Sequence, residues 1–84
     1  MQTIKVTISR RNIGNNKIGN AFENVIKAGQ KIVGSIFEPC ALWPGKYQIE
    51  IKVGPGYMLK SEADTMPDAV LEFDRLTDGK YIFN

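Results

Sequence analysis

Two segments of the chain alternate apolar and polar residues with a period of two, and this pattern constrains the fold more than any other feature. In residues 4–8 isoleucine and valine alternate with lysine and threonine, and in residues 47–53 tyrosine, isoleucine and valine alternate with glutamine, glutamate and lysine. Successive side chains of a strand point to opposite faces, so each segment predicts a strand with one buried face and one solvated face. Strands of this kind are typical of antiparallel sheets.

Two further strands are expected near the middle of the chain. Residues 31–37 form a short apolar run that is interrupted by Gly34 and followed by Pro39. A glycine inside such a run predicts a bulge or a close approach of another part of the chain. Residues 54–56, Gly-Pro-Gly, predict a turn, after which residues 57–59 return as a short strand.

The apolar period changes to that of a helix after the first strand. Apolar residues fall at i, i+4, i+7 and i+8, which places them in one stripe on a helix surface. The stripe consists of Ile18, Phe22, Val25 and Ile26. Asn15 or Asn16 would cap the first turn, and Gly29 would supply the left-handed residue that ends the helix. The sequence therefore predicts a helix of about three turns at residues 16–28.

Residues 67–76 fit two patterns. Ala69 and Leu71 alternate with polar neighbours as in a strand, whereas Val70 and Phe73 fit a helix that begins at Pro67. The Asp-Gly pair at 78–79, followed by the apolar residues 81–83, favours a terminal hairpin, so we expect strands here.

Together these segments predict a small single domain over residues 1–84 with an α+β fold. The expected order is β-α-β-β-β-β, in which a mainly antiparallel sheet of about four to six strands carries one α-helix packed on one face. A chain of 84 residues buries a single modest core.

The composition removes several kinds of chemistry. The chain has no histidine and one cysteine, Cys40, so the usual zinc sites and the Ser-His-Asp and Cys-His nucleophiles are excluded. Residues 14–19 match the first half of a phosphate-binding loop, but Asn20 and Ala21 stand where lysine and serine or threonine are required. We expect no enzymatic activity, no cofactor and no metal site.

The charges are sorted along the chain. Residues 1–37 hold six basic side chains and one acidic one, whereas residues 61–84 hold two basic and six acidic ones. The basic loop at residues 9–17 precedes the predicted helix, whose N-terminus favours anions. The candidate binding residues there are Arg10, Arg11, Asn12, Asn15, Asn16 and Lys17. They would hold a phosphate or an acidic protein surface; alternatively they keep the loop soluble or pair with the acidic C-terminal third.

Trp43 is the remaining candidate binding residue. It precedes a Pro-Gly turn, where an indole serves either as an exposed anchor for a protein partner or a base, or as a cover for the edge of the core.

The function expected from these features is that of a small non-enzymatic protein-binding module, an inhibitor, adaptor or regulator that acts by surface recognition. A compact inhibitor encoded by a phage or another mobile element would have this size and character. The alternative is binding of RNA or single-stranded DNA through the basic loop 9–17 and the helix N-terminus. Exposed edge strands would allow either a monomer or a homodimer.

Localisation is expected to be cytoplasmic. No apolar run approaches the roughly 18 residues of a membrane span, and the N-terminal residues alternate instead of forming the apolar stretch of a signal peptide. A single cysteine fits a reducing compartment.

Overall fold

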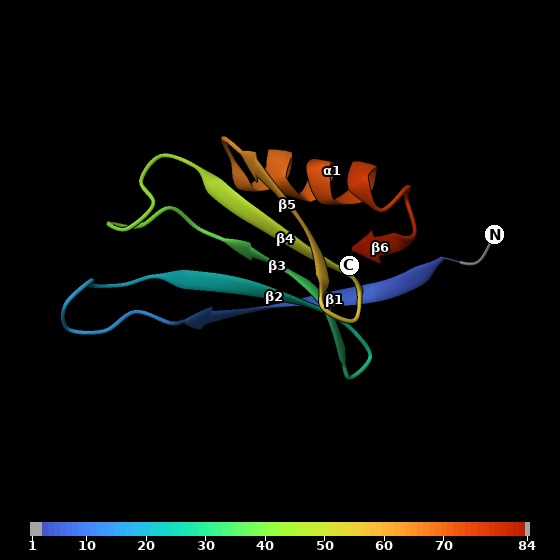
Figure 1. Cartoon of the computed structure of the whole chain (residues 1–84), viewed down its shortest axis with the longest axis horizontal. Helices are drawn as coiled ribbons and strands as arrows, with labels where there is room; N and C mark the ends of the chain where they lie inside the picture. The colour runs from blue at the N-terminus through green and yellow to red at the C-terminus, as the bar shows by residue number, and fades with distance from the viewer. Residues whose placement is uncertain (1–2, 84) are drawn as a thin grey trace.

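The computed structural model describes residues 3–83, which form one six-stranded sheet and one helix (Figure 1). The elements in chain order are β1 (Ile4–Asn12), β2 (Phe22–Ala28), β3 (Lys31–Phe37), β4 (Tyr47–Gly54), β5 (Tyr57–Ala63), α1 (Met66–Leu76) and β6 (Tyr81–Phe83). The spatial order of the strands is β5-β4-β3-β2-β1-β6, and every neighbouring pair is antiparallel except β1 and β6, which are parallel. The predicted α+β class, with a mainly antiparallel sheet and one helix, is confirmed.

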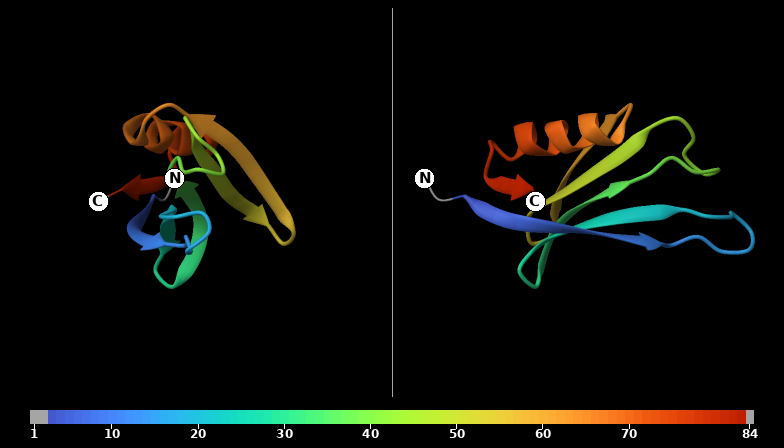
Figure 2. Two further views of the ribbon diagram at one scale, coloured as in Figure 1. Left: turned by 90° about the vertical axis from the view of Figure 1, so that its left-hand side faces the viewer. Right: turned by 180° about the vertical axis from the view of Figure 1, so that it is seen from behind.

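The sheet is curled, and α1 lies across its concave side (Figure 2). The alternation predicted in residues 47–53 explains which side is buried, because Ile49 and Ile51 of β4 are each 1% exposed and belong to the core under α1. Gln48 and Lys52 alternate with them and therefore lie on the outer, convex face. Helix α1 contributes Ala69 and Phe73 to the same core.

Gly34 allows α1 to sit this close to the sheet. A Cβ atom at Gly34 would lie 2.5 Å from the carbonyl oxygen of Glu50 and 2.7 Å from Cε2 of Phe73. The pairing of β2 with β3 also shifts register between Ile26 and Lys27, which marks a bulge in this region. Both features that a glycine in the 31–37 run predicts are therefore present: a close approach of other parts of the chain and a bulge nearby.

The helix predicted at residues 16–28 was wrong. Residues 22–28 form strand β2, which lies between β1 and β3, and the residues before it form the loop at the tip of the β1–β2 hairpin. Because β2 is covered on both faces, its polar residues Glu23 and Asn24 are buried as well as Val25 and Ile26. The helix-like spacing arises because these buried polar residues interrupt the apolar ones in sequence.

The strands predicted in residues 67–76 and the terminal hairpin were also wrong. That segment is α1, and the Oγ1 atom of Thr65 accepts a hydrogen bond from the amide of Asp68 at 3.2 Å, which caps its N-terminus. Pro67 lies in the first turn, where its missing N–H costs nothing. Residues 81–83 form β6, which pairs with β1 on the far edge of the sheet. The observed order is therefore five strands, then the helix, then the last strand.

Candidate functional site

The predicted binding residues lie at one end of the molecule, at the tip of the β1–β2 hairpin and in the neighbouring connection between β3 and β4 (Figure 1). Arg10, Arg11 and Asn12 belong to the end of β1, Asn15, Asn16 and Lys17 belong to the hairpin loop, and Trp43 belongs to the β3–β4 connection. Strand β1 pairs with β2. The amide of Glu38, just after β3, donates a hydrogen bond to the carbonyl of Phe22 in β2 at 2.9 Å, which brings the β3–β4 connection beside the hairpin.

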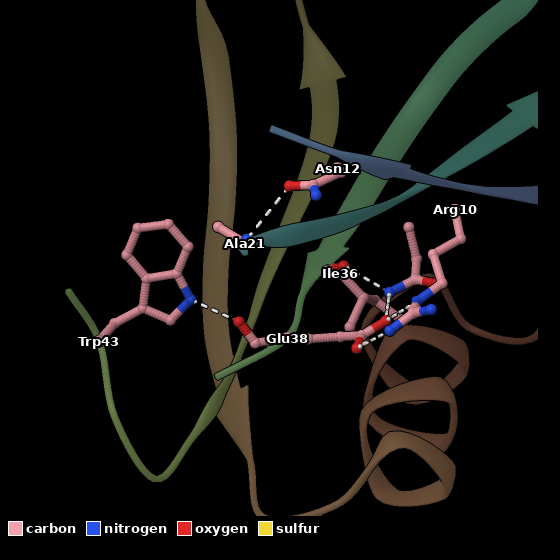
Figure 3. Close-up of polar contacts among 7 residues, drawn as sticks. Arg10, Asn12, Ala21, Ile36, Glu38 and Trp43 are labelled. Carbon is pink, nitrogen blue, oxygen red and sulfur yellow. Dashed lines mark hydrogen bonds and ion pairs between the residues drawn. The ribbon is translucent and has the colours of Figure 1, made fainter. Parts of the chain in front are cut away.

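Glu38 joins Arg10 and Trp43, two of the predicted residues (Figure 3). Nε and Nη2 of Arg10 donate to the two carboxylate oxygens of Glu38 at 2.8 and 2.9 Å, and Nδ2 of Asn24 donates to the same carboxylate at 2.9 Å. The indole Nε1 of Trp43 donates to the main-chain carbonyl of Glu38 at 2.7 Å. Sequence reasoning missed Glu38, whose role depends on strand pairing that no local signal reveals.

The ion pair between Arg10 and Glu38 shifts the pKa of both groups. The hydrogen bonds from Arg10 hold the pKa of the Glu38 carboxyl below its ordinary value of 4.5, and the same contact raises the pKa of Arg10. The Arg10 guanidinium also lies 3.7 Å from the centroid of the Phe22 ring, which favours its position by a cation–π contact. Arg10 is therefore engaged within the molecule, through its hydrogen bonds to Glu38 and through the contact of its guanidinium group with the Phe22 ring.

Arg11 is engaged on the opposite face of β1. Its Nη2 lies 2.6 Å from Oε1 of Glu23, which is 8% exposed, and the hydroxyl of Ser35 donates to the other oxygen of that carboxylate at 2.6 Å. The buried carboxylate thus has partners for both oxygens, as a buried charge requires. Both arginines have acidic partners, and neither partner comes from the acidic C-terminal third of the chain.

The asparagines of the hairpin shape its loop. Oδ1 of Asn12 accepts hydrogen bonds from the amides of Gly14 and Ala21, and Nδ2 of Asn12 donates to Asn20 at 3.0 Å. Oδ1 of Asn15 accepts from the amides of Lys17 and Ile18 at 2.8 and 3.1 Å, a local turn that asparagine commonly forms.

The loop is not an anion site at a helix N-terminus, because no helix begins there. Asn16 and Lys17 are exposed, and within residues 3–83 the Lys17 ammonium makes no ion pair. Lys17 is therefore the one cation of the predicted set that remains free for a partner in the part of the chain that the structure describes.

Trp43 both covers the sheet and borders a hollow. Its ring packs edge-on against Phe37, with centroids 6.1 Å apart and planes at 85°. We call the adjacent depression, of about 220 Å³, the Trp43 hollow; it lies on the outer face of the sheet. Its lining consists of Phe37, Trp43, Gln48, Ile49, Glu50 and Lys60. Leu42, next to Trp43 in sequence, is 60% exposed.

Strand β5 forms one edge of the sheet beside this hollow. It pairs with β4 only, so its other edge carries main-chain N–H and C=O groups without a strand partner among residues 3–83. Lys60 of β5 lies 3.9 Å from Glu50 of β4, so the positive charge at the middle of this edge strand is opposed by a carboxylate. An apolar hollow, a mixed polar rim and a free strand edge therefore lie together.

Two other kinds of site were sought in residues 3–83. No group of three or more Cys, Asp or Glu side chains is placed to hold a metal ion there, and none of the described helices is long and apolar enough to cross a membrane.

Comparisons with protein-family models, with curated proteins and with solved structures gave no match for this chain.

Proposed function

We propose that this protein is a small non-enzymatic protein-binding module, an inhibitor, adaptor or regulator, that recognises its partner through the Trp43 hollow and the adjoining edge of β5. The observation that carries this proposal is the hollow itself. Its walls include the aromatic rings of Trp43 and Phe37, and its rim includes Gln48, Glu50 and Lys60. An apolar centre with a polar rim of both signs is the usual arrangement of a protein interface, and tryptophan is among the commonest residues at its energetic centre.

The free edge of β5 supports the same proposal. An extended segment of a partner, or a second copy of the chain, would gain main-chain hydrogen bonds by pairing with β5. Lysine at the middle of an edge strand ordinarily discourages such pairing, but Glu50 opposes the charge of Lys60 here. A strand added at β5 would run beside Lys60 and direct alternate side chains over the outer face toward the hollow.

Binding of RNA or single-stranded DNA is the less supported function. Arg10 and Arg11, the residues best suited to phosphate, are held by Glu38 and Glu23. To bind phosphate they would have to leave carboxylates that would then lack their cations. The proposed setting is the cytoplasm, because Cys40 is a free, partly buried thiol.

The test is an affinity capture from a lysate, followed by a binding titration with the captured protein. A partner that uses the Trp43 hollow should lose about 2 kcal/mol or more of binding free energy on Trp43→Ala, roughly a 30-fold rise in Kd. Because Trp43 also packs on Phe37, a second variant, Leu42→Asp, changes an exposed side chain next to Trp43 in sequence without removing a packed one.

The matched control is Leu71→Asp, which makes the same change at a leucine on α1 that is 67% exposed. We expect Leu42→Asp to weaken binding and Leu71→Asp to leave it unchanged, with circular dichroism confirming that both variants are folded. Equal affinities for the wild type and both Trp43→Ala and Leu42→Asp would refute the proposed surface. Tight binding of single-stranded nucleic acid that falls steeply with salt would favour the alternative function.

A further inference from the structure

A larger cavity lies at the opposite end of the strands from Trp43. It has a volume of about 520 Å³ and lies where the β2–β3 turn, the β4–β5 turn and the end of α1 meet. β3 begins at this cavity and ends at the Trp43 hollow, and β4 runs in the reverse direction, so the two sites occupy the two ends of the same strands. The cavity is independent of the surface proposed above.

The floor of this cavity is apolar. Ile32 and Val33 of β3, Ile51 of β4 and Leu76 of α1 line it together with the ring of Tyr81. Most of these side chains belong to the core or pack against it, so the floor is fixed by the fold. Val53, which also lines the cavity, is 46% exposed and leaves apolar surface open at the entrance. Cavities of this volume with apolar walls are typical of sites for small organic molecules.

The charged residues that line the cavity are all basic. Lys31 follows the β2–β3 turn and Lys80 precedes β6, so two separate elements each bring a lysine to the cavity; Lys52 of β4 also lines it, but its side chain lies on the outer face, opposite Ile51. No aspartate or glutamate lines the cavity, and none of the three lysines makes an ion pair within the described residues 3–83. Nζ of Lys80 lies 5.5 Å from the centroid of the Tyr81 ring, so this cation is positioned directly beside the apolar floor.

We propose that this cavity binds a small organic anion that carries its charge on an apolar body. The ammonium groups of Lys31 and Lys80 would neutralise a carboxylate, phosphate or sulfonate, while the apolar body covers the floor formed by Ile51, Leu76 and Tyr81. An inorganic anion would bind more weakly, because it has no apolar body to cover the floor and would lose hydration beside the apolar walls.

The experiment uses 1-anilinonaphthalene-8-sulfonate, a fluorescent dye with a sulfonate on aromatic rings, and its neutral analogue N-phenyl-1-naphthylamine. We expect saturable binding of the anionic dye that weakens at high salt, and binding of the neutral dye that does not change with salt. Lys31→Gln and Lys80→Gln should each raise the Kd of the anionic dye by about threefold, the effect of one partly exposed charge pair.

Lys17→Gln is the control, since it makes the same change of net charge at a free lysine in the β1–β2 loop. It should leave the Kd of the anionic dye unchanged, and so should Trp43→Ala, which separates this proposal from the protein-binding one. Val53→Gln should weaken both dyes because it adds a polar group to the apolar entrance. Equal effects of Lys17→Gln and of the substitutions at Lys31 and Lys80, or no effect of any of them, would overturn the proposal.

Competition then identifies the ligand class. Displacement of the anionic dye by dodecanoate indicates an aliphatic body, and displacement by adenosine monophosphate indicates an aromatic one. Inorganic phosphate at the same ionic strength should displace neither dye. Displacement by inorganic phosphate alone, or by none of the three competitors, would refute the requirement for an organic anion.

Discussion

Addition of one methyl group at Gly34 should destabilise the protein strongly. In Gly34→Ala the new Cβ would lie 2.5 Å from the Glu50 carbonyl oxygen, about 0.8 Å closer than a C–H···O contact allows, and 2.7 Å from Cε2 of Phe73. The Glu50 carbonyl belongs to the main chain of β4, an interior strand of the sheet, and Phe73 is fully buried, so neither neighbour can move without a further cost in free energy. Overpacking of this kind costs about 1–3 kcal/mol or more, and the lost freedom of glycine in the unfolded chain offsets only about 0.5–1 kcal/mol.

We therefore expect Gly34→Ala to lower the free energy of unfolding by about 2 kcal/mol. Urea denaturation followed by circular dichroism measures this, and for a domain of this size the midpoint should fall by roughly 2 M if the slope is about 1 kcal/mol per molar urea. Gly54→Ala is the matched control, because a Cβ there meets nothing within 4 Å. Its midpoint should stay the same or rise slightly.

A double variant tests the proposed cause. Phe73→Leu removes the ring atoms that crowd position 34, so Gly34→Ala should cost less in that background, with a coupling of about 0.5 kcal/mol or more. The contact with the Glu50 carbonyl remains, so the relief should be partial. A midpoint for Gly34→Ala that equals that of Gly54→Ala would show that the reasoning about this close approach is wrong.

Three further predictions concern the helix cap and the Glu38 cluster. Thr65→Ala should reduce the free energy of unfolding by about 1 kcal/mol, because the capped amide of α1 loses its acceptor; urea denaturation should show this, and an unchanged midpoint would contradict the cap. Arg10→Ala should lower the urea midpoint through the loss of its bonds to Glu38, whereas Lys17→Ala should not; equal midpoints would mean that the bridge contributes nothing. Because the folded-state pKa of Glu38 lies below its ordinary value of 4.5, the stability that its ionised form adds is complete above that value and lost as the pH falls through the folded-state pKa. The gap in unfolding free energy between the wild type and Glu38→Gln should therefore narrow between pH 7 and pH 3, and a constant gap would assign no role to the charge.

The strands with one solvated face could be predicted from the sequence because their pattern is local. Ile49 and Ile51 alternate with polar neighbours whatever else the chain does, and the solvated face of β4 preserves that alternation. Strand β2 has no solvated face, so its alternation is absent. Glu23 is buried only because Arg11 and Ser35 satisfy its carboxylate, and those partners lie 12 residues away on either side. No reading of residues 16–28 alone contains that information.

The position of α1 did have a local signal. Thr65 and Asp68 form the Thr-x-x-Asp pattern that begins many helices, with Pro67 in the first turn. The apolar residues of the segment favoured a strand because Leu71 was counted as a buried position, but Leu71 is 67% exposed to solvent. The capping residues were therefore more informative here than the apolar period.

The candidate site was only partly predictable for the same reason. Trp43 could be identified as an aromatic residue in a turn, but the hollow beside it depends on Phe37 and Lys60 from two different strands. The basic residues of the loop 9–17 are close together in sequence, but the acidic partners of Arg10 and Arg11 become visible only once the strand register is known. Arg11 and Glu23 are direct cross-strand partners in the β1–β2 hairpin.

The parallel pairing of β6 with β1 has a consequence for how the protein is made. Ile4 pairs with Tyr81, and the rings of Tyr81 and Phe83 pack against Phe73, so contacts in the core join segments from nearly opposite ends of the sequence. The first five strands follow one another as neighbours, and hairpins form in microseconds once their residues are free. On the ribosome, the nascent meander would have β1 as an unpaired edge and Phe73 without its aromatic neighbours until residue 83 emerges from the exit tunnel. The core is therefore completed only after β6 has emerged, and until then β1 presents an unpaired strand edge to other chains.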